Sequence, residues 1–241
     1  MKIEIVTHCY AAKYPHYAQA LCYKLSQLVL NPPSCNVAVT ICYNELDCLT
    51  NQVIDWFETK LKLYHMRLPV PYLGRRCIGR NYAARTTNAN VVWFDDVDQV
   101  YTKECLETLA EMTWPYGAVM VYPKIIQIHQ DHVTGDQVTG LITEPQLKDI
   151  DKTLFIEKKY NRAIGGIQIV QGEFAREFGY LDGDRKWQQP RLDNNPFGDF
   201  RDDIAYRSFC QTKGTIVGID LPGVFRIRHT HTSYQPPKTI Q

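Results

Sequence analysis

An apolar strand that runs directly into three carboxylates constrains this chain more than any other feature. Residues Val91 to Phe94 read V-V-W-F and are followed by Asp95, Asp96 and Asp98. A buried strand that ends in carboxylates places negative charge at the carboxyl edge of a sheet, where open α/β folds bind ligands. The spacing of Asp96 and Asp98 suits Mg²⁺ or Mn²⁺, which take one or two carboxylates and complete their shell with phosphate and water. An ordinary acidic turn after a strand is the alternative, because aspartate is common in turns.

Strand-like and helix-like segments alternate along the chain, which favours an α/β layer architecture. In the first half we expect strands over 2–7, 37–43 and 91–94 and helices over 17–30, 49–63, 80–88 and 103–111. In the second half we expect a long strand over 118–129, a polar hairpin tip over 130–140, an apolar strand over 167–170, a helix over 172–178 and a long polar loop that ends near 198. The first half is nearly a nucleotide-binding βαβαβ unit. With no repeat and no linker, the pattern predicts one domain over 1–241, with a nucleotide-binding half over about 1–115 and an acceptor-binding half over about 116–241.

The composition narrows the classes of function. The chain has 241 residues, 44% of them apolar and 22% charged, as in an ordinary globular protein. Lys and Arg number 27 against 26 Asp and Glu, so the net charge of +1 argues against nucleic acid as a partner. The N-terminus lacks the apolar core of a signal peptide, and no segment approaches the roughly 18 apolar residues of a membrane span. We therefore expect a cytoplasmic protein with no integral membrane segment.

The cysteines point to the same compartment. There are eight of them, scattered along the chain and without a C-x-x-C pair. Several lie in apolar runs, as Cys22 and Cys42 do, where free cysteines behave as small hydrophobic residues. We expect reduced structural thiols.

A second acidic pair, Asp202 and Asp203, stands at the start of an expected amphipathic helix. Acidic residues there interact favourably with the helix dipole and stabilise the helix, so capping is one explanation of the pair. The dipole would also lower their pKa and keep at least one of them ionised, as a general base must be. The pair alone leaves both explanations open.

The order of these motifs resembles the inverting glycosyltransferases of family 2, which have the GT-A fold. The similarity rests on segments that span roughly residues 2–233: G-R-N-Y-A-A-R at 79–85, V-V-W-F-D-D-V-D at 91–98, G-G-I-Q-I-V-Q-G-E-F-A-R-E-F-G-Y-L-D at 165–182, R-D-D-I-A-Y-R at 201–207 and R-H-T-H-T-S at 228–233. Each motif is weakly specific, but their order and spacing are hard to obtain by chance. The resemblance implies a GT-A-like fold with a Rossmann-type central mixed sheet flanked by helices.

The resemblance also implies roles for the acidic residues. Asp96-Val97-Asp98 is similar to the D-x-D motif that holds Mn²⁺ or Mg²⁺ on the diphosphate of a nucleotide sugar. Asp98 would be the direct metal ligand, Asp96 would lie nearer the ribose or sugar, and Asp95 would be an extra carboxylate. Asp203 matches the general base that deprotonates the acceptor hydroxyl.

Other positions follow the family less closely. Asp202 stands where glutamate is usual, which leaves the division of labour with Asp203 open. His229 or His231 resembles a C-terminal histidine that completes the metal site. Strand alternation places His229 on one face with Phe225 and Ile227, so we expect it to point inward.

The nucleotide and acceptor pockets are implied with alternatives. Glu45 or Asp47, with Glu45 preferred, would contact the base, and the alternative for both is a solvated charge. Arg80 and Asn81 match an R-N pair at a helix start that meets phosphate or base, and a helix cap is the alternative for Asn81.

For the acceptor, Gly166 and Trp187 are expected at the binding surface, with Tyr180 near Trp187. A sugar acceptor would stack on the indole ring of Trp187, and a partly buried core aromatic is an equal alternative for that residue.

The expected function is a metal-dependent inverting glycosyltransferase, a hexosyltransferase-type enzyme that moves a sugar from a nucleotide-diphosphate sugar to the hydroxyl of a carbohydrate or other acceptor. One rival is a nucleotidyltransferase, although these enzymes usually carry a glycine-rich basic loop after the first strand, where this chain has H-C-Y-A-A-K-Y-P-H. The other is a non-catalytic nucleotide-sugar or carbohydrate-binding domain of the same fold. The sequence identifies neither the sugar, the base nor the acceptor.

Overall fold

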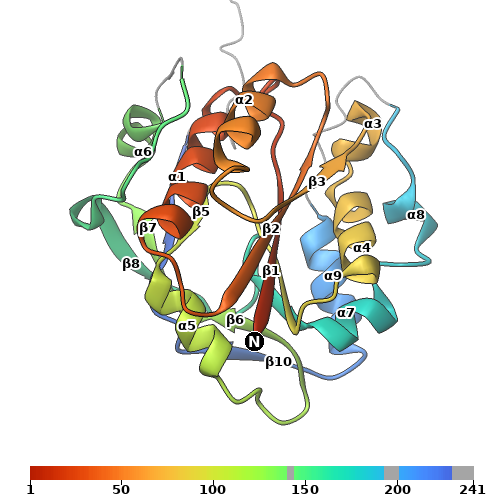
Figure 1. Cartoon of the computed structure of the whole chain (residues 1–241). Coiled ribbons are helices and arrows are strands. Elements are labelled where there is room, and N and C mark those ends of the chain that lie inside the picture. The colour runs from red at the N-terminus through yellow and green to blue at the C-terminus, as the bar shows by residue number, and fades with distance from the viewer. Residues whose placement is uncertain (140–143, 193–200, 230–241) are drawn as a thin grey trace, which may run out of the picture.

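The computed structural model describes residues 1–139, 144–192 and 201–229 (Figure 1). Its largest element is a seven-stranded sheet in the order β10-β6-β9-β4-β1-β2-β3. The strands are β1 (Lys2–His8), β2 (Asn36–Tyr43), β3 (Leu63–Arg67), β4 (Val91–Phe94), β6 (Ala118–Pro123), β9 (Gln168–Gln171) and β10 (Thr215–Ile219). Strand β9 runs antiparallel to both of its neighbours and the remaining pairs are parallel, so the sheet is mixed, as expected.

A smaller sheet has four strands in the order β5-β11-β7-β8. They are β5 (Gln99–Tyr101), β7 (Ile125–His129), β8 (Phe155–Lys159) and β11 (Val224–Arg226). Strand β5 follows β4 after only four residues, so the chain passes from the large sheet to the small one through Asp95–Asp98. The acidic segment therefore lies at the junction of the two sheets.

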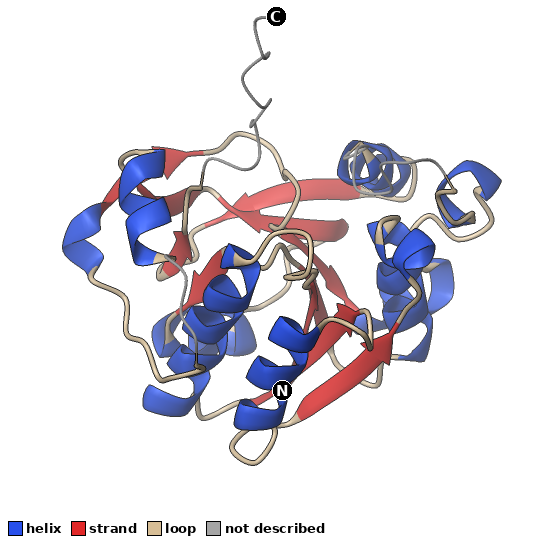
Figure 2. Ribbon diagram, turned by 90° about the horizontal axis from the view of Figure 1, so that it is seen from above, coloured by secondary structure: helices blue, strands red, loops and turns tan. Residues whose placement is uncertain are grey.

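Helices flank the large sheet on both sides. The described helices are α1 (His16–Leu30), α2 (Cys48–Phe57), α3 (Val70–Leu73), α4 (Arg76–Thr86), α5 (Lys103–Glu111), α6 (His132–Val138), which contacts the small sheet, α7 (Gly172–Phe178), α8 (Arg185–Gln188) and α9 (Asp202–Gln211), with a 3₁₀ turn η1 at Lys152–Leu154. Figure 1 shows α1, α2 and α5 on one side of the sheet and α4, α7 and α9 on the other. Figure 2 shows the strands running through the middle of the molecule with helices around them. Among the described residues, none of these helices is long and apolar enough to cross a membrane.

The core explains why the central strands form. Strands β1 and β4 are covered on both faces, and Ile3, Ile5, Val92 and Trp93 are fully buried. Such strands read as continuous apolar runs rather than alternating ones. All eight cysteines are free thiols, and six of them are buried.

Three expected elements are wrong in the structure. The strand expected over 118–129 breaks at Lys124 into β6 and β7, which belong to different sheets. The hairpin tip expected over 130–140 is helix α6, whose N-terminus is capped by Asp131 through the backbone N–H of Thr134. The helix expected over 49–63 ends at Phe57, and the edge strand β3 follows.

The helix expected over 80–88 begins four residues earlier, at Arg76. Arg80 therefore lies inside helix α4 and not at its start, which corrects the expectation that Arg80 and Asn81 would stand beside free backbone N–H groups. The residue at the first turn is Arg76.

Candidate functional site

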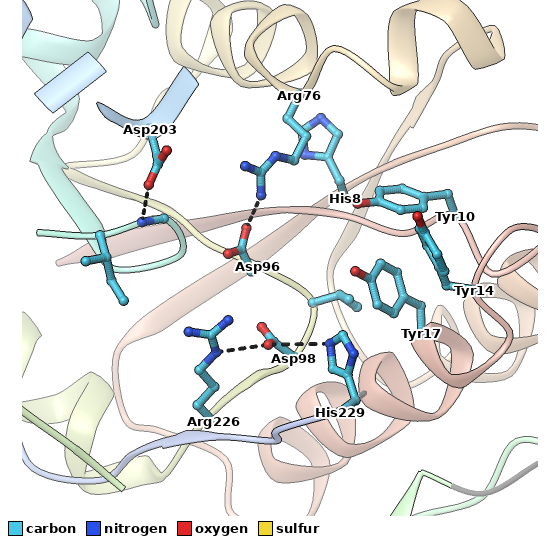
Figure 3. Close-up of a pocket in the computed structure, with 13 residues that line it drawn as sticks. His8, Tyr10, Tyr14, Tyr17, Arg76, Asp96, Asp98, Asp203, Arg226 and His229 are labelled. Atoms are coloured by element: carbon cyan, nitrogen blue, oxygen red, sulfur yellow. Dashed lines mark hydrogen bonds and ion pairs between the residues drawn. The ribbon is translucent and has the colours of Figure 1, made fainter. Parts of the chain in front are cut away.

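A cavity of about 330 Å³ opens where β1 and β4 end and α9 begins. Carboxylates, arginines, histidines and tyrosines from both halves of the chain surround it (Figure 3). The lining residues are His8, Tyr10, Tyr14, Tyr17, Arg76, Asp96, Val97, Asp98, Ile164, Gly165, Asp203, Arg226 and His229. It lies at the carboxyl edge of the sheet, where the acidic strand end predicted a site.

Asp95 points away from this cavity and into the core. Its carboxylate forms a buried ion pair with Lys24 of α1 and accepts a hydrogen bond of 2.6 Å from the hydroxyl of Tyr101. Burial raises the pKa of Asp95, and the ammonium group of Lys24 opposes that rise. Asp95 is thus a structural partner of α1.

Asp96 faces the cavity and is held by two arginines of α4. Its Oδ1 lies 2.7 Å from Nη1 of Arg76 and 3.1 Å from Nη2 of Arg80. Burial opposes ionisation, but the guanidinium groups of Arg76 and Arg80 lower the pKa of Asp96 to about 2. Asp96 is therefore a carboxylate at neutral pH.

Asp98 presents one engaged and one open carboxylate oxygen. Its Oδ2 lies 3.0 Å from Nε of Arg226 and 3.8 Å from Nε2 of His229. Its Oδ1 is buried and accepts no hydrogen bond from any residue that the structure describes. A buried acceptor without a donor is costly, which suits an oxygen that binds a cation.

A divalent metal fits this position with few protein ligands. The described residues contain no cluster of three or more His, Cys, Asp or Glu side chains arranged to hold a metal ion. Mg²⁺ and Mn²⁺ require fewer, because phosphate and water complete their shells. Oδ1 of Asp98 is the best-placed ligand, and Asp96 and His229 line the same cavity. His231 lies outside the described residues.

The two aspartates at the start of α9 have different surroundings. Asp202 is buried, with Oδ1 at 3.0 Å from Nη2 of Arg76 and Oδ2 at 3.6 Å from Nη1 of Arg80. Asp203 lines the cavity, and its Oδ2 accepts a hydrogen bond of 2.7 Å from the backbone N–H of Gly165. Burial raises the pKa of Asp203, so the expected lowering by the helix dipole is wrong for this residue.

Two glycines let backbone approach these carboxylates. A Cβ on Gly165 would lie 3.1 Å from Oδ2 of Asp203. Gly166 has φ of +83°, and a Cβ there would meet the amide nitrogen of Gln99 and lie 3.0 Å from Oδ2 of Asp96. Gly166 was expected at the acceptor surface; the structure places it behind Asp96, where its carbonyl accepts a hydrogen bond of 3.0 Å from Trp93.

One wall of the cavity is aromatic. The ring centroids of Tyr10, Tyr14 and Tyr17 lie 5.0–5.6 Å from one another, and His229 lies 5.6 Å from Tyr17. Figure 3 shows these tyrosines on the side of the cavity opposite Asp203. Rings at such spacing offer a flat apolar surface with polar edges.

The structure does not bring the other predicted residues to the cavity. Glu45 is exposed, and Asp47 caps α2 by accepting hydrogen bonds from the backbone N–H and hydroxyl of Thr50. Arg80 is fully buried behind Asp96. Their assignment to the nucleotide pocket stays a prediction.

Asn81 and Trp187 likewise serve neighbouring segments. Asn81 joins α4 to the loop after α7, accepting from the backbone N–H of Tyr180 at 2.9 Å and donating to Asp182 at 3.2 Å. Trp187 is buried with Arg75 over its ring, 5.4 Å from the centroid. Tyr180 is fully buried and donates to Gln168.

Sequence reasoning missed Arg76, Arg226 and the tyrosines. Arg76 precedes Arg80 by four residues, a spacing that puts both on one helix face. The tyrosine spacing at 10, 14 and 17 is also helical, although the first two precede α1. The sequence contains these spacings, but the helices expected over 80–88 and 17–30 began too late to include Arg76 and the first two tyrosines.

Comparisons with known proteins address the fold. No protein-family model matches the sequence, and no curated protein sequence matches it either. Among solved structures the chain is similar to S. aureus TarS residues 1–349, with a TM-score of 0.55 and 14% identity over 94% of this chain and 60% of that one. The same TarS fragment in complex with UDP gives a TM-score of 0.54 and 16% identity, over 93% of this chain and 60% of that one. The chain thus spans about 60% of the length of these TarS structures. Together, the mixed sheet, its flanking helices and this similarity show that the chain has a GT-A-like fold.

Proposed function

We propose that this protein is a metal-dependent inverting glycosyltransferase that moves a sugar from a nucleotide-diphosphate sugar to an acceptor hydroxyl. One observation carries the proposal: a single cavity holds Asp98, with an open buried oxygen, and Asp203, a half-buried carboxylate with a raised pKa. Glycosyl transfer requires both, since the leaving diphosphate must be neutralised and the acceptor must lose a proton.

Asp203 supports the role of general base. Its Oδ2 is fixed by the N–H of Gly165, and no described residue donates a hydrogen bond to Oδ1. Oδ1 would accept the proton of the acceptor hydroxyl as its oxygen attacks the anomeric carbon. A raised pKa strengthens a carboxylate as a base, and positioned proton transfer contributes roughly 10²–10⁴-fold.

Asp98 and the arginines support the leaving-group side. Asp98 would hold Mn²⁺ or Mg²⁺, which would act as a Lewis acid toward the diphosphate. Arg76 and Arg226 line the same cavity and would add hydrogen bonds to phosphate oxygens. With one base and no covalent nucleophile in the scheme, attack opposite the leaving group inverts the anomeric configuration.

The proposal also includes finer assignments. TarS binds UDP, so we extend a uridine diphosphate donor to this chain as part of the proposal. The aromatic wall of Tyr10, Tyr14 and Tyr17 would pack against a ring of the substrate. Membership of family 2 and a hexose as the transferred sugar belong to the proposal as well.

The deciding experiment combines turnover with calorimetry. Purified protein would be screened against nucleotide sugars with Mn²⁺ or Mg²⁺ by a coupled assay for diphosphate release. UDP binding would be measured with and without metal in the wild type, in Asp98→Ala and in Asp55→Ala, a control that removes an exposed aspartate of α2.

We expect the metal-dependent part of UDP affinity to vanish in Asp98→Ala alone. Undiminished affinity in that variant would remove Asp98 as the metal ligand. UDP binding without turnover on any donor and acceptor would support the binding-domain alternative.

A further inference from the structure

A second, smaller cavity adjoins the first behind Asp98. It has a volume of about 190 Å³ and shares Asp98, Arg226 and His229 with the first cavity. Its other walls come from the small sheet and from the first residue of α6. It is therefore a separate space that meets the candidate active site along one side.

The charge in this second cavity is unbalanced. Three cations line it, Lys158 of β8, Arg226 of β11 and Arg228, against the single carboxylate of Asp98. Arg226 pairs with Asp98 through Nε, while Lys158 and Arg228 have no carboxylate partner among the residues that the structure describes. The lining thus carries an excess of two positive charges.

Arg228 is held in place rather than loosely solvated. Its Nη1 donates to the carbonyl of Gln130 at 3.0 Å, and its Nη2 lies 3.0 Å from Nε2 of His132. Nδ1 of His132 lies 2.9 Å from the carbonyl of His229. With the proton of His132 on Nδ1, this ring donates to His229 and accepts from Arg228. These bonds orient the guanidinium group of Arg228, whose charge also interacts with the exposed carboxylate of Asp131 but forms no ion pair with it.

We propose that this second cavity binds a phosphate group next to the nucleotide-sugar site. Paired guanidinium and ammonium donors in a confined space are what phosphate recognition requires, because charge-assisted hydrogen bonds are short and strong. The phosphate has two possible sources, the diphosphate of the donor or a phosphate carried by the acceptor. The reference to a donor and an acceptor rests on the proposed function, whereas the anion site itself does not.

The test measures binding of inorganic phosphate and pyrophosphate by calorimetry, without metal and at low ionic strength. The variants are Lys158→Gln, Lys158→Gln with Arg228→Gln, and Lys159→Gln as the matched control. Lys159 is the next residue of the same exposed strand and points to the opposite face.

We expect the affinity of the double variant for phosphate to be at least about tenfold lower, because each hydrogen bond to a charged group contributes to the free energy of binding. Lys158→Gln should show a smaller loss and Lys159→Gln none. Lys158 is exposed and forms no side-chain hydrogen bond with a described residue, so its variant should fold normally even if loss of Arg228 disturbs the segment around His132. Equal phosphate affinity in the wild type and in Lys158→Gln, or no phosphate binding by the wild type, would overturn the proposal.

A second arm separates the two sources. If the donor's diphosphate occupies the cavity, the double variant loses affinity for UDP as well as for phosphate. If the acceptor supplies the phosphate, UDP affinity is unchanged, and KM rises for a phosphate-bearing acceptor but not for a neutral one. A wild-type protein that binds phosphate but neither UDP nor any nucleotide sugar would keep the anion site and reject the proposed function.

Discussion

The two acidic segments of the candidate site, Asp95–Asp98 and Asp202–Asp203, each contain one aspartate that points into the core and one that faces the cavity. In each, the first aspartate turns inward to a buried cation: Asp95 pairs with Lys24, and Asp202 pairs with Arg76 and Arg80. A following aspartate faces the cavity: Asp98 has an open oxygen, and Asp203 is held by a single N–H at one oxygen. Carboxylates of the same segment thus differ in their chemistry because they point in different directions and meet different partners.

The difference between the inward-facing and the cavity-facing aspartates follows from the local backbone. At the end of a strand, successive side chains point to opposite faces, and in the first turn of a helix they diverge by about 100°. The first carboxylate of each segment therefore fixes the segment to the body of the protein. The last one, Asp98 or Asp203, is left for a ligand.

The largest expected effect is the loss of glycosyl transfer when Asp203, the cavity-facing aspartate of α9, is replaced. Asp203→Asn should keep UDP affinity near that of the wild type and lower transfer by roughly 10²-fold or more, because an amide cannot accept the proton. Single-turnover kinetics would measure it. Glu173→Gln, which removes an exposed acid from the first turn of α7, is the control and should retain full activity. Near-normal transfer by Asp203→Asn would shift the role of base to Asp202 and break the comparison.

The pH dependence sharpens the same assignment. Burial raises the pKa of Asp203, so the base is protonated and inactive below that pKa and becomes active as the pH rises through it. Well below the pKa, kcat should fall about tenfold for each pH unit, and this acid limb should lie above the ordinary aspartate pKa of about 3.9. Asp96 does not contribute, because its pKa is about 2. A limb at or below the ordinary value, or the same limb in Asp203→Asn, would contradict the assignment.

The structural role of Asp95, the inward-facing aspartate after β4, is tested through the free energy of unfolding. Lys24→Met leaves Asp95 buried without its cation, which should lower the free energy of unfolding by about 3–5 kcal/mol. Urea unfolding measures this, and Lys13→Met, at an exposed lysine, is the control. Adding Asp95→Asn to Lys24→Met should restore part of the loss, since no charge is then left unpaired. A loss no larger than that of the control would mean that Asp95 does not anchor the segment.

The smallest effect concerns the glycine turn between the segments. Gly166→Ala combines a positive φ with a steric contact on Gln99 and should cost about 1–3 kcal/mol. Gly183→Ala is a matched control, because its φ is +79° but a Cβ there meets nothing within 4 Å. The difference between the two variants in thermal or urea unfolding isolates the contact beside Asp96. Equal losses would show that the turn is not constrained by the carboxylates.

Much of the fold was predictable because the central strands are short apolar runs with polar ends. Strand β4 and helices α5 and α7 have the expected bounds, since an apolar run or a clear amphipathic pattern sets them. Helix α6 was not predictable from its composition, because H-V-T-G-D-Q-V lacks strong helix formers and forms on the cap of Asp131. The break between β6 and β7 depends on which sheet each strand joins, which is a tertiary property.

The candidate site was predictable by residue type but not by partner. Asp98, Asp203 and His229 were expected to face a site, and all three line one cavity. The partners of the inner carboxylates come from distant segments: Lys24 lies 71 residues from Asp95, and Arg76 lies 126 residues from Asp202. Local patterns carry no information about such pairs, so Arg76 and Arg226 were found only in the structure.

Arg76 is a counter-ion shared by two carboxylates, and this sharing limits how the protein can change. One guanidinium group reaches Asp96 at the end of β4 and Asp202 at the start of α9. Arg80 also pairs with both carboxylates, so replacing one of these residues unbalances the charge of the whole network, and the effects of their substitutions should be strongly non-additive. Residues 76, 80, 96 and 202 therefore form a single unit of substitution, in which a change at one position is best tolerated with a compensating change at another.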